Sequence, residues 1–294
     1  MDSRLPRNEG LRYNQPMPTF ATRLSAAIRA HSPLCVGIDP SASLLKSCGL
    51  PDSAEGAFEF GKRVLEAADF QLSILKPQSA FFERFGSKGY RAMEELAALA
   101  RSRGVLVLLD GKRGDIDTTA EAYAESYFSP SSALRADAVT THAYLGFAAL
   151  EKFLVIALRN EGGVFVVVRS SNPEGLELQT ARLANGETVA QNLCRAITER
   201  NRLAGNEVLG PIGAVVGATC DDAAETVAAL PGSFILAPGV GAQGATMQDV
   251  LTRMPQARGR VLPNVSRAIL ANGATSSDIR TTIRALQEQA RKLL

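Results

Sequence analysis

Eight short runs rich in apolar and β-branched residues recur along the chain, and they limit its fold more than any other feature. They cover residues 34–39, 70–77, 105–110, 138–141, 164–169, 212–217, 234–238 and 261–265. Segments with helical spacing of Ala, Leu, Glu and Arg lie between most of them, for example at residues 90–101, 120–127, 188–202 and 277–293. Alternation of this kind predicts βα units and a parallel sheet.

Eight strands favour a closed (β/α)₈ barrel, the TIM barrel, over an open doubly wound sheet. The chain has 294 residues, 46% of them hydrophobic, which is enough for one such barrel of roughly 250 residues. No GxGxxG motif follows the first run, so nothing in the sequence indicates dinucleotide binding. We therefore predict a single α/β barrel domain over residues 20–294. Residues 1–19 contain Pro, Gly and Asn without a helical or strand period, and we expect a flexible leader there.

Composition argues against several classes of protein. The formal net charge is +2, from 32 basic and 30 acidic residues, and gives no basic footprint for nucleic acid. The four cysteines are scattered without a CxxC pair and only two histidines are present, which argues against disulfides and a transition-metal site. No apolar stretch approaches the roughly 20 residues of a membrane span, and no secretion signal precedes the first run. We expect a cytoplasmic protein that does not bind a membrane.

Charged residues concentrate where the first three runs end. The first run ends in Asp39, the second carries Lys76, and the third leads into DGKRGD, with Asp110, Lys112 and Asp115. Asp110 and Lys112 are two residues apart and would project to the same side of an extended strand. A DxKxxD motif alone is also typical of a solvated ion pair in a surface loop. In a TIM barrel, however, catalytic groups lie at the C-terminal strand ends, so we expect one site of mixed charge there.

The loops after the last two runs contain groups suited to phosphate. Residues 238–244 form the segment PGVGAQG, whose glycines leave backbone N–H groups accessible. Arg267, after the eighth run, carries a forked donor that matches phosphate geometry. Phosphate in TIM barrels often binds at the loops after strands seven and eight. Together the two features predict a ligand that carries a phosphate group.

The DxKxxD motif, followed here by Ile116 and Thr119, resembles the signature of the orotidine 5'-phosphate decarboxylase family. The segments GIDP, ILKPQ, DGKRGDI, RSSNPEG, APGVGAQG and NVSR occur in the family's order between about residue 20 and residue 294. DGKRGDI together with SNPEG resembles the mainly bacterial branch with longer loops. The resemblance implies decarboxylation of orotidine 5'-phosphate to uridine 5'-phosphate (UMP) plus CO₂, the last step of de novo UMP synthesis, with no cofactor and no metal.

The resemblance also implies roles for individual residues. A catalytic array of alternating charges would consist of Lys76, Asp110, Lys112 and Asp115. Substrate-binding side chains would be Asp39 and Lys76 at the ribose hydroxyls, Ser171 at the pyrimidine, Gln243 and Arg267 at the phosphate, and Thr119. Asp115 and Thr119 would reach the active site of a partner subunit, so the resemblance implies a homodimer with shared sites. Asp117 departs from the family pattern, which usually has Gly or Pro at that position.

Two other functions stay open at this point. One is a metal-dependent aldolase or decarboxylase of the same barrel group, such as a hexulose-phosphate synthase, which shares the DxKxxD core and adds acidic ligands for Mg²⁺ at neighbouring strand ends. The second run carries Lys76 at that position, and an ammonium group repels a cation. The other is a catalytically silent barrel that binds a nucleotide, against which the intact lysine and aspartates of the motif argue.

Overall fold

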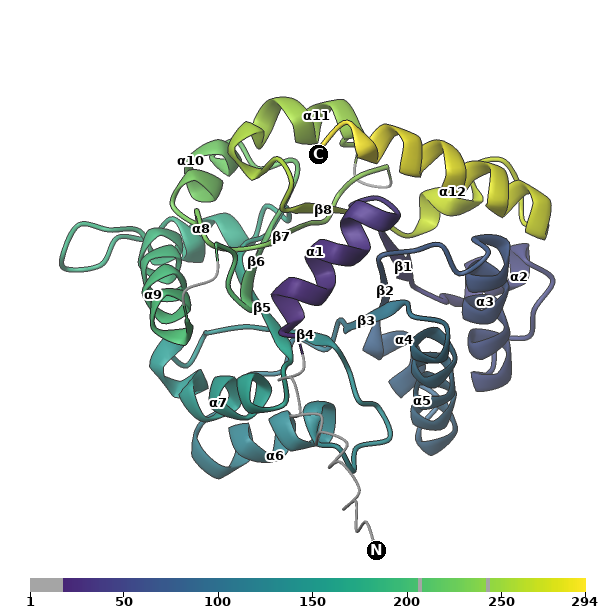
Figure 1. Cartoon of the computed structure of the whole chain (residues 1–294), viewed down its shortest axis with the longest axis horizontal. Helices are drawn as coiled ribbons and strands as arrows, with labels where there is room; N and C mark the ends of the chain where they lie inside the picture. The colour runs from purple at the N-terminus through teal and green to yellow at the C-terminus, as the bar shows by residue number, and fades with distance from the viewer. Residues whose placement is uncertain (1–17, 206–207, 242–243) are drawn as a thin grey trace, which may run out of the picture.

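The computed structural model describes residues 18–205, 208–241 and 244–294, and it forms a closed parallel barrel with helices around it (Figure 1). Strands follow one another around the barrel in chain order, and β1 pairs with β8 to close it. The strands are β1 Cys35–Ile38, β2 Ile74–Pro77, β3 Leu106–Leu109, β4 Ala138–Thr141, β5 Gly163–Arg169, β6 Ile212–Val216, β7 Ile235–Ala237 and β8 Val261–Val265. The prediction of a TIM barrel is confirmed.

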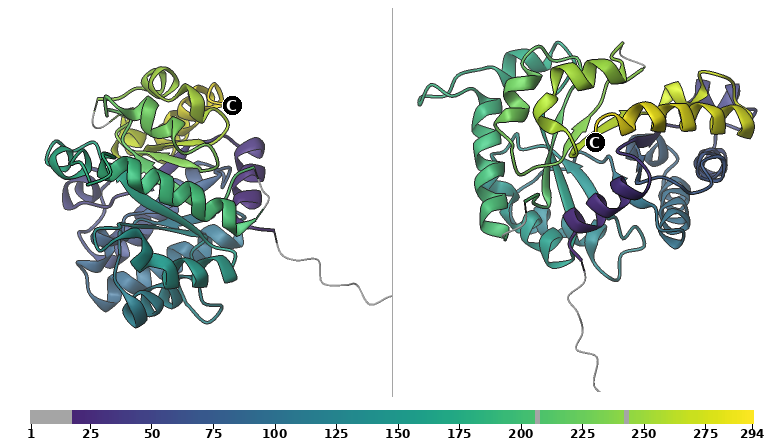
Figure 2. Two further views of the ribbon diagram at one scale, coloured as in Figure 1. Left: turned by 90° about the vertical axis from the view of Figure 1, so that its left-hand side faces the viewer. Right: turned by 45° about the horizontal axis from the view of Figure 1, so that its top comes forward.

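Helices occupy most of the connections between the strands. The α-helices are α1 Phe20–Ala30, α2 Ala42–Ser47, α3 Ala54–Ala67, α4 Ser79–Glu83, α5 Ser87–Ser102, α6 Asp117–Phe128, α7 Glu151–Arg159, α8 Gly175–Gln179, α9 Val189–Ala204, α10 Ala223–Ala228, α11 Met247–Arg253 and α12 Ser276–Arg291. Short 3₁₀ helices cover η1 Phe147–Leu150, η2 Pro255–Ala257 and η3 Arg267–Leu270. The ring of helices closes where α12 packs beside α3, although the two lie far apart in the sequence (Figure 2).

The strands are apolar because both of their faces are covered. Every residue of each strand is buried, apart from one partly exposed position in β5. One hydrophobic cluster lies inside the barrel and another lies between the barrel and the helices. Parallel strands packed in this way lose the polar alternation of a half-solvated strand, which is the pattern that the sequence displays.

Helix α1 lies across the N-terminal end of the barrel (Figure 1). Its side chains Phe20, Leu24 and Ile28 belong to the cluster inside the barrel. The Phe20 ring meets Phe165 edge to face, with centroids 6.0 Å apart. Gly163 leaves room for this contact, because a Cβ there would lie 2.2 Å from the Phe20 ring. With this end closed, the C-terminal ends of the strands remain for a ligand.

The second predicted strand is shorter in the structure than in the sequence analysis. The run over residues 70–77 was expected to be extended throughout, but β2 begins at Ile74. Asp69 and Phe70 adopt φ of 50° and 56°, because they form the turn that follows α3. Residues 1–17 lie outside the described residues, so the flexible leader over residues 1–19 stays a prediction. No helix in the described part of the chain is long and apolar enough to cross a membrane.

Candidate active site

A cavity of about 300 Å³ opens at the C-terminal ends of the strands. All eight strands, or the loops directly after them, contribute to its lining. The residues that the sequence predicts for the site and that line this cavity are Asp39, Lys76, Asp110, Lys112, Ser171 and Arg267. The fold therefore places Asp39 and Arg267 in one cavity, although they are 228 positions apart in the chain.

The carboxylate of Asp110 lies at the centre of the polar contacts in the cavity. Lys76 Nζ donates to its Oδ2 at 2.7 Å, and Gln78 Nε2 donates to the same oxygen at 3.0 Å. Thr140 Oγ1 donates to Oδ1 at 2.8 Å, and Lys112 Nζ forms an ion pair with that oxygen. Four donors from three strands and their loops hold one carboxylate, and charge-assisted bonds of this kind are the strong ones.

Asp110 and Lys76 each stabilise the ionised form of the other inside the barrel. Burial alone would raise the pKa of Asp110, but the ammonium groups of Lys76 and Lys112 outweigh it and hold that pKa well below its ordinary value. Burial would likewise lower the pKa of Lys76, but the carboxylates of Asp110 and Asp39 raise it above its ordinary value. Both groups are therefore ionised at neutral pH, although their side chains are only 8% and 4% exposed.

A turn, and not the alternation of side chains along a strand, brings Lys112 to Asp110. The spacing of Asp110 and Lys112 predicts that the two side chains share one side of an extended segment, but β3 ends at Leu109. Lys112 adopts the left-handed conformation, with φ of 46°, which costs a non-glycine residue roughly 1–2 kcal/mol. Its backbone N–H donates to Thr140 Oγ1 at 3.1 Å, which holds this turn. Strain of this kind persists where surrounding contacts fix the backbone, often at functional sites.

Two of the predicted site residues, Asp115 and Thr119, do not line the cavity of their own chain. Asp115 is not part of its lining, and its Oδ1 accepts a hydrogen bond from the N–H of Ile116 at 2.8 Å. Thr119 is exposed on α6 and lines a separate groove with Tyr90 and Tyr123. Gln243 lies outside the described residues, so its role stays a prediction. A single chain thus assembles three of the four predicted catalytic charges.

Asp39 offers an unused acceptor to a ligand. Its Oδ1 is buried and has no hydrogen-bond partner among the described residues. Buried polar atoms are almost always hydrogen-bonded, so an orphan acceptor in a cavity requires an explanation. A hydroxyl group of a bound molecule can donate to this oxygen, which agrees with the role that the resemblance implies for Asp39.

The side of the cavity formed by β7 and β8 has an accessible backbone and an exposed cation. Gly239 and Gly241 adopt φ of 104° and 81°, a region that glycine enters without strain. Pro238, Gly239 and Arg267 all line the cavity, and Arg267 begins η3. Part of the glycine-rich loop and Arg267 therefore line the same cavity, and their role at a phosphate group stays a prediction.

Thr140 and Gln78 also belong to the site, although no motif in the sequence marks them. Thr140 is fully buried at the end of β4, where it bonds both Asp110 and the backbone of Lys112. The sequence does contain one indication of Thr140: two threonines end the otherwise apolar run of residues 138–141. A buried hydroxyl group needs a hydrogen-bond partner. Gln78 stands directly after β2 and reaches Asp110 from the same edge as Lys76.

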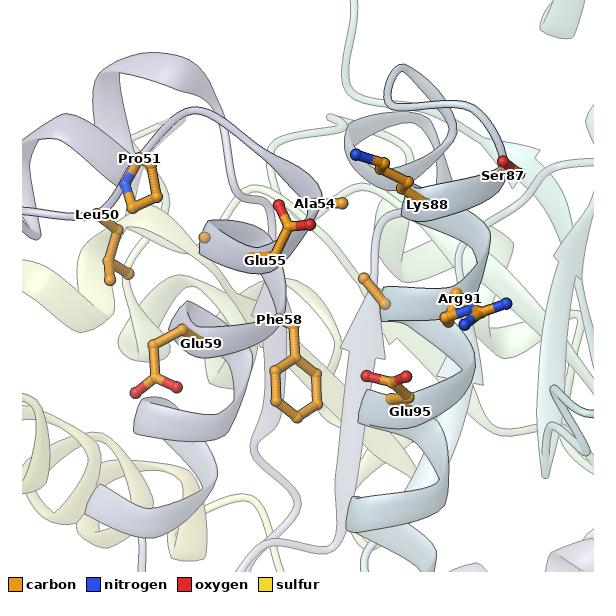
Figure 3. Close-up of a pocket in the computed structure, with 12 residues that line it drawn as sticks. Leu50, Pro51, Ala54, Glu55, Phe58, Glu59, Ser87, Lys88, Arg91 and Glu95 are labelled. Carbon is orange, nitrogen blue, oxygen red and sulfur yellow. The ribbon is translucent and has the colours of Figure 1, made fainter.

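A second hollow lies on the outer surface between α3 and α5 (Figure 3). It is lined by apolar side chains such as Leu50 and Phe58 and by charges of both signs, among them Glu55, Lys88 and Arg91. None of the strand-end residues described above belongs to it. None of the described site residues that the sequence predicts is among the residues that line this outer hollow.

Comparison with known proteins agrees with this geometry. The model of the orotidine 5'-phosphate decarboxylase / HUMPS family matches residues 32–281. Orotidine 5'-phosphate decarboxylase of Salinispora arenicola is 46% identical over 264 residues, which cover 90% of this chain and 94% of that protein. The enzyme of the same name from Myxococcus xanthus is 44% identical over 91% of this chain and 93% of its own length.

Solved structures give the same result. A Streptomyces avermitilis protein assigned as an orotidine 5'-phosphate decarboxylase superposes with a TM-score of 0.89 at 41% identity, over 97% of this chain and 99% of that chain. The OMP decarboxylase of Leishmania donovani superposes with a TM-score of 0.77 at 31% identity, over 94% and 98% of the two chains. With its barrel, its strand-end charges and these matches, the chain belongs to the orotidine 5'-phosphate decarboxylase / HUMPS family.

Proposed function

We propose that the chain is a carboxy-lyase that converts orotidine 5'-phosphate to UMP and CO₂, the last step of de novo UMP synthesis, with no metal or organic cofactor. The observation that carries the proposal is the Lys76–Asp110–Lys112 array, in which one buried carboxylate holds two ammonium groups at the mouth of the barrel. Relatives that are 41–46% identical to this chain carry the name of that activity.

The array supplies what this decarboxylation needs. When the bond between C6 and the carboxylate breaks, CO₂ leaves and the electron pair stays on C6 as an sp² carbanion without adequate delocalisation. The Lys112 ammonium, oriented by Asp110, stabilises the developing negative charge on C6. Lys112 then donates a proton to C6, which completes UMP, and it recovers a proton from solvent. A freely rotating lysine would not be oriented for either step.

The rest of the cavity suits a nucleotide. We assign Asp39 and Lys76 to the ribose hydroxyls and Ser171 to the pyrimidine, and all three residues line the cavity. Arg267 and the loop after β7 bind the phosphate, with Gln243 as a further contact in the same loop.

We also propose a cytoplasmic location, because Cys35, Cys48, Cys194 and Cys220 are all free thiols, as expected in a reducing compartment.

A direct assay separates this function from the alternatives. We expect the purified protein to convert orotidine 5'-phosphate, followed by the change in pyrimidine absorbance, at a rate that excess EDTA does not alter. Lys76 stands where a metal-dependent relative needs an acidic ligand, and its charge repels a cation. Loss of activity in EDTA, restored by Mg²⁺, would favour the metal-dependent aldolase or decarboxylase. Binding without turnover would favour a silent nucleotide-binding barrel.

The phosphate contact leads to a second expected result. Arg267→Ala should lower kcat/KM for orotidine 5'-phosphate by about 10²-fold, or about 3 kcal/mol, because it removes a charged partner of the phosphate. Orotidine, which lacks the phosphate, should react at nearly the same slow rate with both proteins, since remote binding energy acts only when the phosphate is present. Arg258→Ala, a change at an exposed arginine outside the cavity, is the control. Equal losses with both substrates would contradict this role.

A homodimer would complete the array. Three exposed apolar side chains, Ile116, Tyr144 and Leu145, are 50%, 75% and 53% exposed on two loops at this end of the barrel. The loops touch, because a Cβ on Gly114 would lie 2.3 Å from the carbonyl oxygen of His142. Exposed apolar groups of this kind commonly mark a protein interface. We propose that a second copy covers them and that Asp115 and Thr119 of each subunit enter the other subunit's site.

Mixing two inactive variants tests the shared site. Lys112→Ala and Asp115→Ala should each be nearly inactive as homodimers. After subunit exchange, the hybrid dimer contains one site with both native residues, so we expect the mixture to recover about a quarter of the wild-type activity. An activity no greater than the sum of the separate variants would show that Asp115 acts in its own subunit or not at all.

A further inference from the structure

Arg113, the residue directly after Lys112, forms an ion pair that the reaction described above does not use. Its Nη2 donates to both carboxylate oxygens of Glu83, at 2.6 and 2.7 Å. Its Nη1 donates to the carbonyl oxygen of Gly111 at 2.7 Å. The two side chains are 32% and 24% exposed, so the pair is better shielded from water than an ordinary surface ion pair.

The pair joins the two segments that carry the charges of the site. Glu83 is the last residue of α4, which begins two residues after the strand that contains Lys76. Arg113 belongs to the loop that begins after β3 and contains Asp110 and Lys112. The Glu83–Arg113 pair therefore ties the C-terminal end of α4 to the loop that contains Lys112.

Hydrogen bonds hold the backbone on both sides of Lys112, and one of them comes from the Arg113 side chain. The carbonyl group of Gly111, just before Lys112, accepts from the Arg113 guanidinium, and the carbonyl group of Arg113 accepts from Thr141 Oγ1. Lys112 itself is held in a left-handed conformation that most residues avoid. A turn in this conformation relaxes when its supports are removed, and the ammonium group at its centre then loses its direction.

We propose that Glu83 and Arg113 are positioning residues, whose ion pair holds the Lys112 turn so that its ammonium group points at the reacting carbon. The proposal rests on the proposed function. Neither residue lines the cavity at the barrel mouth, so neither touches the substrate. Their effect must therefore act through the orientation of Lys112, on kcat and not on substrate binding.

Glu83→Gln tests the pair. It keeps the size of the side chain but removes the charge and one of the two acceptor oxygens. We expect kcat for orotidine 5'-phosphate to fall about 10- to 100-fold, since a displacement of about 1 Å at a reacting group has effects of that size. KM and the affinity for UMP should stay within about threefold of the wild type, because the groups that bind the nucleotide are unchanged.

The chain offers a matched control on its outer surface. Glu151 of α7 pairs with Arg200 of α9 through two contacts, Nε to Oε2 and Nη2 to Oε1, both at 3.1 Å. Glu151→Gln removes one acceptor from a two-bond pair in the same way, but at a distance from the Lys112 loop. We expect its kcat to equal that of the wild type, and its melting temperature to fall about as much as that of Glu83→Gln.

Further variants keep the test decisive. Arg113→Lys retains the charge without the fork, and we expect an intermediate loss of kcat; this variant serves if Glu83→Gln does not fold. In the double variant Glu83→Gln/Arg113→Lys, kcat should be no lower than in the slower single variant, because both changes remove the same interaction.

Three results would overturn the proposal: a kcat for Glu83→Gln within twofold of the wild type, an equal fall of kcat in Glu151→Gln, or a rise of KM in Glu83→Gln without any change of kcat. An inactive wild type would instead overturn the proposed function.

Discussion

Replacing Lys112 with alanine is expected to lower kcat by about 10⁴-fold or more, while the affinity for UMP stays within about tenfold of the wild type. The variant loses two contributions at once. A positioned general acid typically contributes 10²–10⁴-fold, and a charge aimed at the developing carbanion contributes about 10²–10³-fold. Single-turnover decay of orotidine 5'-phosphate measures the chemical step separately from product release.

The control for this result is a lysine with carboxylate neighbours outside the cavity. On the solvent-facing side of α3, Lys62 Nζ lies 3.6 Å from Glu59 Oε2 and 4.0 Å from Glu66 Oε1. Lys62→Ala should leave kcat unchanged, which shows that the loss of a paired lysine is not harmful in general. Near-normal turnover by Lys112→Ala would mean that the C6 proton comes from another group and that the proposed mechanism is wrong.

Asp110→Asn should damage both catalysis and stability. The variant leaves the ammonium groups of Lys76 and Lys112 close together without the carboxylate between them, and Lys76 is only 3% exposed. Breaking a buried ion pair costs about 3 kcal/mol, because one charge stays buried without its partner. We also expect kcat to fall by on the order of 10³-fold, and Asp110→Asn/Lys112→Ala to be little slower than Lys112→Ala, since the two residues act as a unit.

The stability loss should depend on pH in a defined direction. Because the pKa of Asp110 in the folded protein lies below its unfolded value, its contribution is complete above the unfolded pKa and disappears as the pH falls through the folded pKa. The difference in free energy of unfolding between the wild type and Asp110→Asn should therefore be constant above about pH 5 and shrink below about pH 4. Urea titrations at several pH values measure it. A difference that grows at low pH would contradict the contacts of Asp110.

The fold could be predicted from the sequence because its signals are local. Each apolar run is long enough to form a strand, and most runs are followed by a segment with helical spacing. Helix starts are also marked locally: Thr188 caps α9 in a capping box with Gln191, and Thr275 does the same for α12 with Asp278. The predicted start of the second strand was wrong because Phe70 is apolar yet belongs to a turn. Apolar character alone does not distinguish a strand residue from a buried turn residue.

The site was predictable only where its residues stand at strand ends. Asp39, Lys76 and Arg267 are recognised by that position together with their charge. The turn at Lys112 was not predictable, because its left-handed backbone depends on Thr140 from a neighbouring strand. The contact between Glu83 and Arg113 likewise joins residues 30 positions apart, and nothing in the local sequence of either residue marks the pair.

Asp117 shows how a departure from a family pattern acquires a physical meaning. The structure gives it φ of 44°, a conformation that glycine adopts without strain and that aspartate tolerates better than most residues. Its carboxylate also lies 3.8 Å from the ammonium group of Lys152. The aspartate is therefore compatible with the backbone that a glycine at this position would allow.

A crystal structure with UMP bound tests the central claim most directly, because the claim is about where one ammonium group points. We expect Lys112 Nζ within about 3–3.5 Å of C6 of the uracil ring, with Asp110 still holding it. We also expect Asp115 of the partner subunit beside the same ammonium group. A bound nucleotide with Lys112 turned into bulk solvent, or with Asp110 remote from the base, would contradict the account.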